Sequence, residues 1–243
     1  MVSAGIVRYK GLLRAACAAV GLAVGVSGFG ISGCSSGDPL AGQSGKQVLD
    51  KAVGNLKSAS SFTMAGAVTE SGGAYTVNLG YKPGNGCTGT VNQAGKGALS
   101  VVVIGKTAWV KPDAAFWKAT AGSQAATVIR VLGGKYLKGS TSDGTVAGLA
   151  KLCDVNSLAA QLQAPTNVAM GHVTTVSGTS AVPLTDRAKG STLYVTDASS
   201  PQVLQLVNSK TGTPGKITFN VGAPVTLTPP APSQVVDGSK YGF

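Results

Sequence analysis

The residues with the clearest chemical potential in this 243-residue chain are its four cysteines, Cys17, Cys34, Cys87 and Cys153. A cysteine can act as a nucleophile, a metal ligand, half of a disulfide or a lipid attachment point, and its surroundings decide among these roles. No two cysteines are spaced as C-x-x-C, and His172 is the only histidine. A redox motif and a zinc site are therefore both disfavoured, and we expect no metal and no cofactor.

Cys34 stands between an apolar stretch and a small polar one. Residues 15–31 (AACAAVGLAVGVSGFGI) carry almost no polar side chains and follow a basic start with Arg8, Lys10 and Arg14. This is the layout of an export signal peptide. Residues 31–34 (ISGC) resemble the bacterial lipobox, in which an aliphatic and two small residues precede a cysteine that becomes lipid-modified. The alternative is an ordinary secretory signal that leaves Cys34 as a free thiol.

The lipobox interpretation implies a lipoprotein anchored to the extracytoplasmic face of the cell membrane. Residues 1–33 would be cleaved, and Cys34 would carry a diacylglycerol, with palmitate-like chains, and an amide-linked acyl chain. Two or more acyl chains hold a protein on a bilayer stably, whereas one chain does not. We expect residues 34–45 to form a lipidated tether and residues 46–243 to form one domain with a proline-rich C-terminal end.

The expected export of the chain and the distribution of its charge disfavour nucleic acid as a partner. Removing Arg8, Lys10 and Arg14 from the 20 basic residues leaves 17 against 9 acidic residues, a net charge of +8. The lysines are scattered and form no basic stripe interleaved with aromatic residues. A basic exterior suits an anionic membrane surface or an acidic wall polymer, or is simply solvated. The sequence names no protein partner, and we expect a monomer.

Cys87 and Cys153 remain once the signal and the lipid site are assigned. They are an even pair in an exported chain, and a disulfide between them is the simplest interpretation.

The periodicity of apolar residues predicts the helices and strands that position these cysteines. Helical spacing predicts an amphipathic helix over residues 46–58, and further helical segments between residues 121 and 163 around a glycine-rich break at 139–148. Alternation predicts strands in two groups, separated by turns: 62–68, 75–81, 88–93, 98–105 and 107–111, then 168–178, 191–197, 201–209 and 216–222. The last residues, 223–238, are expected to form a final strand that runs into a proline-rich tail.

Two segments resemble a known family of actinobacterial lipoproteins, the LppX, LprA, LprF and LprG group, which have a fold like that of the lipoprotein carrier LolA. Residues 55–68 (NLKSASSFTMAGAV) resemble the family's first helix and first strand. Residues 101–119 (VVVIGKTAWVKPDAAFWKA) resemble its strand, Gly-Lys turn, aromatic strand and following tryptophan. The resemblance implies an α+β fold in which a curved antiparallel sheet, a half-barrel, carries helices on its concave face.

The resemblance also implies a function, because lipid-binding members of the group hold acyl chains in an apolar cavity between sheet and helices. We therefore expect a protein that binds, and carries, lipid or glycolipid. The residues expected to line such a cavity, or a fully packed core in its place, are Val77, Leu79, Val101, Val103, Val128 and Leu132. The alternative is a structural or interaction lipoprotein that acts on a wall polymer or a membrane partner through its outer surface.

Enzymatic activity is not expected. Glu70, the only glutamate, lies next to a turn, and His172 lies within a strand pattern. General acid and base catalysis needs titratable groups that converge, and no serine-hydrolase or metalloprotease motif occurs. A hydrolase with an unrecognised site is a third option, which His172→Ala and activity screening would test.

Overall fold

The computed structural model describes residues 38–70, 73–142 and 144–241. Cys34 and the expected signal peptide lie outside the described residues. Within those that are described, no helix is long and apolar enough to cross a membrane.

Helix α1 (Gly45–Ser58) confirms the amphipathic helix expected at residues 46–58. Ser44 caps its start, because the Ser44 side chain accepts a hydrogen bond from the Gln47 backbone N–H and the Gln47 side chain accepts one from the Ser44 N–H. The apolar face of α1 is buried in the main core, through Val48, Leu49, Ala52, Val53 and Leu56.

Residues 38–45, which were expected to be part of the tether, are packed in the structure, as Leu40 shows. This side chain is only 1% exposed and belongs to the main core. The Leu40 N–H donates to the Asp38 carboxylate, and the Leu40 carbonyl accepts from the Gln43 N–H, at 2.9 and 3.1 Å. Residues 38–45 therefore belong to the folded part of the protein.

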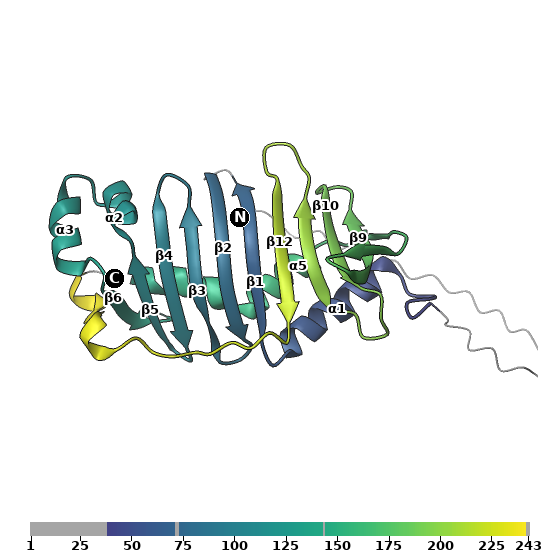
Figure 1. Ribbon diagram of the computed structural model, residues 1–243, viewed down its shortest axis with the longest axis horizontal. Helices are drawn as coiled ribbons and strands as arrows, with labels where there is room; N and C mark the ends of the chain where they lie inside the picture. Colours follow the sequence, from purple (N-terminus) through teal and green to yellow (C-terminus); the bar gives the residue numbers. More distant parts are fainter. Residues whose placement is uncertain (1–37, 71–72, 143, 242–243) are drawn as a thin grey trace, which may run out of the picture. The chain divides into compact units, whose positions relative to one another are not determined.

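The strands form one sheet that is antiparallel throughout, except where β13 pairs with β6 (Figure 1). Among the described residues its order is β13-β6-β5-β4-β3-β2-β1-β12-β11-β10-β9-β7, and β8 also pairs with β9. The first group of strands is β1 (Phe62–Glu70), β2 (Gly73–Lys82), β3 (Gly86–Gln93), β4 (Gly97–Ile104), β5 (Thr107–Pro112) and β6 (Tyr136–Ser140). The second is β7 (Ala169–Met170), β8 (Thr174–Val176), β9 (Thr179–Asp186), β10 (Ser191–Thr196), β11 (Val203–Asn208), β12 (Gly215–Val221) and β13 (Val235–Asp237).

Three helices cover one face of this sheet, which we call the inner face. They are α1, α4 (Gly144–Ala150) and α5 (Val155–Gln163), and the 3₁₀ turn η2 (Lys151–Cys153) joins the last two (Figure 1). α1 packs against α5, and α4 packs against β4, β5 and β6. Buried residues from Leu40 to Phe219 form one apolar cluster between the helices and the sheet. The predicted α+β fold, a curved antiparallel sheet with helices on its concave face, is confirmed.

Helices α2 (Ala114–Thr120) and α3 (Ala125–Leu132), joined by η1 (Gly122–Gln124), pack at the β6 end of the sheet. They surround a second, smaller cluster of Trp117, Leu132 and Leu137. The helical segments expected between residues 121 and 163 are present as α3, α4 and α5, but the sequence did not predict the strand β6 that lies between α3 and α4. Tyr136–Ser140 is a strand because β5 and β13 pair with it on both sides, which residues near it in the chain do not reveal.

The C-terminal segment crosses the face of the sheet opposite to the helices. Ser61 holds its start, since the Ser61 hydroxyl donates to the Ala223 carbonyl and the Gly222 N–H donates to the Ser61 carbonyl. Val225 then packs over Gly80, where an added Cβ would lie 3.1 Å from it. The strand expected to begin near residue 223 was wrong, because prolines in this segment cannot donate ladder hydrogen bonds. The chain pairs again only at β13, after η3 (Pro232–Gln234), and ends in η4 (Gly238–Tyr241).

Candidate functional site

Four of the six expected cavity residues lie together on the inner face, but three of them are packed. Leu79 of β2 and Val101 of β4 flank Gly89 of β3, and they are 1% and 2% exposed. Val103 of β4 is 5% exposed, whereas Val77 of β2 is only partly buried. The helix layer therefore fills the space above Leu79, Val101 and Val103 with side chains.

The other two expected residues lie elsewhere. Leu132 belongs to the second cluster around Trp117, and Val128 packs against that cluster. The structure thus brings Val77, Leu79, Val101 and Val103 together in the main core and does not join Val128 or Leu132 to them.

A groove of about 430 Å³ opens between the helix layer and the other half of the sheet. This volume lies in the range of about 300–1,000 Å³ that ligand pockets span. Its apolar lining comes from α1, α5, the segment that precedes β7, and the strands β9 to β11: Leu49, Leu162, Val168, Leu184, Leu193 and Leu206. Its polar lining is Glu70, Gln161, Asp186, Lys189, Ser191 and Asn208. None of the six expected residues lines it.

The strand register extends the floor of this groove into an apolar row that crosses the inner face. Residues paired across neighbouring strands share one face of a sheet. The pairings place one residue of each strand from β7 to β4 in this apolar row: Met170, Leu184, Leu193, Leu206, Ile217, Gly66, Val77, Val91 and Leu99. One expected residue, Val77, thus lies on the same row as the groove.

The middle of the apolar row has no side chain, because Gly66 occupies it. Gly66 has φ +155°, and a Cβ added there would lie 2.0 Å from the Lys216 carbonyl oxygen of the neighbouring strand. Gly66 lies between Ile217, which is only 6% exposed, and the half-buried Val77. The helix layer therefore covers part of the row, and its accessible part includes the half-buried Leu206 and Val77.

Charged groups at the groove differ in whether they already accept hydrogen bonds from the protein. Asp186 is 7% exposed, and its carboxylate accepts hydrogen bonds from the Ala188 and Lys189 N–H groups at 3.0 and 3.3 Å. The hydrogen bonds of that carboxylate stabilise the turn after β9. The side chains of Lys189 and Glu70 are exposed and can meet a polar headgroup.

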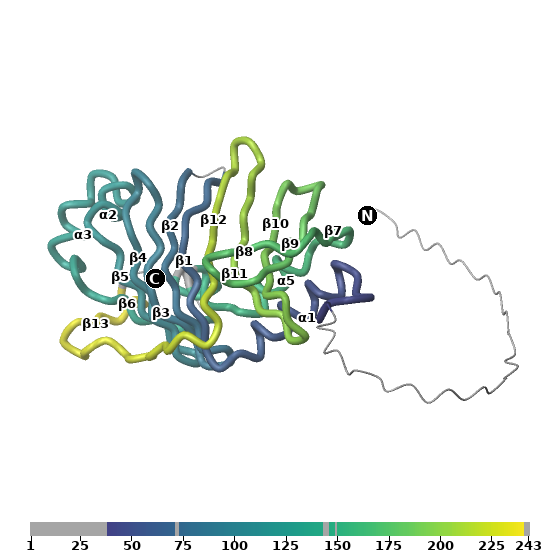
Figure 2. Tube along the Cα trace, turned by 45° about the vertical axis from the view of Figure 1, so that its right-hand side comes forward, coloured from purple at the N-terminus to yellow at the C-terminus, as the bar shows by residue number. Residues whose placement is uncertain are grey.

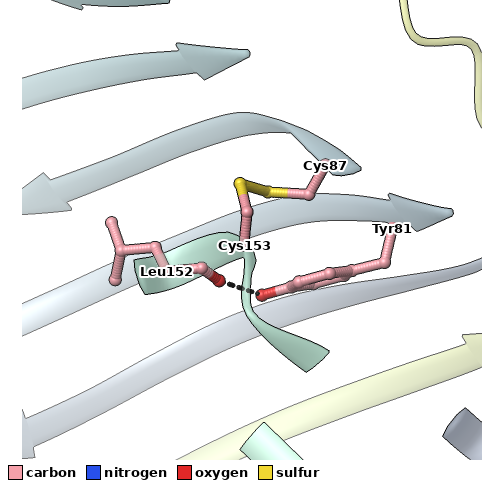
Figure 3. The surroundings of a disulfide bond; sticks show 4 residues. All are labelled: Tyr81, Cys87, Leu152 and Cys153. Atoms are coloured by element: carbon pink, nitrogen blue, oxygen red, sulfur yellow. Dashed lines mark hydrogen bonds between the residues drawn. A yellow bond between two sulfur atoms is a disulfide. The ribbon is translucent and has the colours of Figure 1, made fainter. Parts of the chain in front are cut away.

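Three consecutive residues fix the start of α5, which forms one wall of the groove. The Tyr81 hydroxyl donates to the Leu152 carbonyl at 2.8 Å, and Cys153 is disulfide-bonded to Cys87 of β3, with a Cα separation of 5.2 Å (Figure 3). Asp154 caps α5, and its pKa is lowered chiefly by the hydrogen bond from the Ser157 hydroxyl, and also by backbone N–H donors. The disulfide predicted between Cys87 and Cys153 is thus present and ties the helix layer to the sheet.

The residues considered for catalysis are dispersed. His172 is exposed and lies in the loop between β7 and β8, not inside a strand as expected. Glu70 ends β1, and among the described residues no three His, Cys, Asp or Glu side chains gather as a metal site would require.

Sequence reasoning missed the groove partly because it missed β9, one of the three strands that form its floor. Strand β9 carries Pro183, and a proline inside a run argues against a central strand. The available signal was the period-two spacing of Val182 and Leu184, followed by Thr185, although Pro183 weakens it.

No protein-family model and no curated protein sequence matches the chain. Its structure is similar to that of LprF from Mycobacterium bovis, with a TM-score of 0.53 and 20% identity, over 77% of this chain and 97% of LprF. It is also similar to the lipoprotein LppX of Mycobacterium tuberculosis, with a TM-score of 0.48 and 12% identity, over 76% of this chain and 98% of LppX. A LolA superfamily protein from Nitrosomonas europaea aligns over 73% of this chain and 91% of its own, with a TM-score of 0.24 and 12% identity. The likeness to LprF shows a shared fold and confirms the architecture that the sequence resemblance implied.

Proposed function

We propose that this protein is a membrane-anchored lipoprotein that binds, and carries, the acyl chain of a lipid or glycolipid in the groove between α1, α5 and the sheet. The observation that carries the proposal is the groove itself, whose apolar floor continues along the apolar row and whose lining includes the exposed Glu70 and Lys189. An amphiphile matches this distribution, with its chain on the floor and its headgroup at the charged residues.

The energetics favour a chain over a compact polar ligand. Each methylene that leaves water for an apolar surface gains about 0.8 kcal/mol. Adjacent strands are about 4.8 Å apart, so the groove floor formed by β9, β10 and β11 spans about 10 Å and accommodates several methylenes. Polar ligands would gain little along it, because the row contains no polar side chain.

Leu206→Trp tests this function. Leu206 is half-buried on the floor of the groove, and an indole there would occupy the space of several methylenes. We expect wild-type protein, purified from an actinobacterial host, to carry a lipid adduct in native mass spectrometry, and Leu206→Trp to lose it.

The matched control is Val207→Trp, one residue further along β11. Val207 points to the opposite face of the strand and does not line the groove. It should keep the adduct. A wild-type protein that is free of ligand and takes up no added glycolipid would exclude the carrier function.

That outcome would favour the alternative, an interaction lipoprotein. One surface suits it, because residues 106–142 at the β6 end contain six basic residues against the single acidic Asp113: Lys106, Lys111, Lys118, Arg130, Lys135 and Lys138. Such an excess of positive charge attracts acidic polymers.

A further inference from the structure

The edge of the sheet beside the start of α1 exposes two apolar side chains, one at the end of β7 and one in the short loop that follows it. Met170 ends β7 and is 39% exposed, and Val173 precedes β8 and is 54% exposed. Among the described residues, the other exposed large apolar side chains are Val131 on α3 and Leu152 on η2. Met170 is also the outer end of the apolar row that forms the groove floor.

The loop exists because Pro183 interrupts the pairing of this edge. The Pro183 carbonyl accepts a hydrogen bond from the Gly171 N–H at 2.9 Å, but proline has no N–H to return. A Cβ on Gly171 would lie 2.8 Å from the Pro183 ring. The edge therefore splits into β7 and β8, and residues 171–173 leave the ladder between them.

Two cations lie at the same end of β9 as Met170. Met170 pairs with Leu184, and Arg187 and Lys189 occupy the turn that begins after Asp186. Both side chains are exposed, while the carboxylate of Asp186 is buried and bonded to the backbone of the turn. Exposed apolar residues next to cations are the combination that binds an anionic lipid surface.

The predicted anchor lies within short reach of this edge. Gly45, the first residue of α1, is so close to the chain before β7 that an added Cβ would lie 2.4 Å from the Val168 carbonyl oxygen. Leu40 is fixed in the core five residues earlier. The chain from Cys34 to Leu40 spans at most about 22 Å even when fully extended. Figure 2 shows β7, β8 and β9 at the end of the sheet where α1 begins.

We propose that the edge formed by Met170, Val173, Arg187 and Lys189 is a docking surface for the anionic bilayer that holds the Cys34 anchor. This inference rests on the lipidation of Cys34 that belongs to the proposed function. Docking places the groove, which Lys189 and Val168 line, at the membrane surface. An acyl chain then passes from the bilayer past Met170, whose strand partner Leu184 lines the groove, into that groove.

Tryptophan fluorescence in vesicles tests the docking surface. Full-length lipidated protein with Met170→Trp or Val173→Trp is reconstituted into vesicles of phosphatidylcholine and phosphatidylglycerol with brominated acyl chains, which quench indoles inside the bilayer. Both variants should show blue-shifted, quenched emission. The native Trp109 and Trp117 lie on β5 and α2, at the far end of the sheet, and give the baseline.

The matched control is Val131→Trp, an equally exposed apolar position on α3, which should not be quenched. Adding Arg187→Gln and Lys189→Gln to Met170→Trp should reduce the quenching, and high salt should do the same because it screens these charges. Unchanged quenching in the doubly neutral variant would overturn the anionic part of the proposal.

The result separates docking from carrying. If the mass of the reconstituted protein confirms the anchor and neither Met170→Trp nor Val173→Trp is quenched, the docking surface is overturned while acyl binding stands on its own test. If both are quenched in a protein that holds no acyl ligand, the docking surface is upheld and the carrier function fails.

Discussion

Tyr81 illustrates how one buried polar group is kept satisfied under the helix layer. Its ring stacks on Phe62 at a centroid distance of 4.6 Å, and its hydroxyl donates to the Leu152 carbonyl. Burial raises the pKa of Tyr81 above the ordinary value of a tyrosine. The neutral phenol is therefore the form that the folded protein requires.

Tyr81→Phe should destabilise the protein by about 1–2 kcal/mol near neutral pH, because the Leu152 carbonyl loses its partner. The pKa is higher in the folded state, so the contribution of Tyr81 is complete below the unfolded pKa of about 10 and falls as pH rises above it. Urea unfolding of both proteins from about pH 8 to about pH 11 measures this. We expect the difference between them to shrink at high pH; a constant difference would contradict this role of Tyr81.

At the scale of elements, the disulfide joins β3 to the turn that starts α5, across a sequence separation of 66 residues. In the chain-entropy model, closing a loop of this length stabilises the folded state by about 4 kcal/mol. Both cysteines are buried, and the bond connects layers that also meet through apolar packing and the hydrogen bond from Tyr81 to Leu152.

Replacing Cys87 and Cys153 with alanine should lower the free energy of unfolding by about that amount. Hydrogen exchange should then show reduced protection first in α4 and α5, while β10 to β12 keep theirs. An equal loss across the whole sheet would contradict a local role in holding the helix layer.

At the scale of the whole molecule, the anchor and the groove are predicted to act together. An anchor at Cys34, as proposed, would keep the domain near the bilayer, since Leu40 in the core lies only six residues after it.

Cys34→Ala should release the protein from the membrane and abolish labelling by radioactive palmitate, because no acyl chain can then be attached. Fractionation of cells that express wild-type and variant protein measures both effects. The groove is formed by residues distant from Cys34 in the sequence, so the released variant should still bind a lipid in native mass spectrometry. A Cys34→Ala protein that stays labelled and in the membrane would contradict the lipobox interpretation.

The sequence alone determined the features that neighbouring residues encode. The period of Val48, Leu49, Ala52 and Val53 predicted α1, and the alternation from Phe62 to Tyr81 predicted β1 and β2. Local patterns suffice for these elements because the physical cause lies within a few residues. The pairing of Cys87 with Cys153, 66 residues apart, was inferred from the even number of remaining cysteines. The lipobox interpretation of Cys34 stays a prediction.

Only the tertiary structure decided which apolar side chains of the sheet the helices leave accessible. Leu79 and Val77 have the same alternation in sequence, yet Leu79 lies under the helix layer and Val77 lies on the apolar row. Strand pairing places Leu184 of β9 and Leu99 of β4 in the same row. The sequence did not predict β9, because Pro183 weakens its strand pattern. Strand register and the packing of helices on the sheet depend on contacts between residues far apart in the chain. Such contacts produce no periodic pattern among neighbouring residues from which they could be predicted.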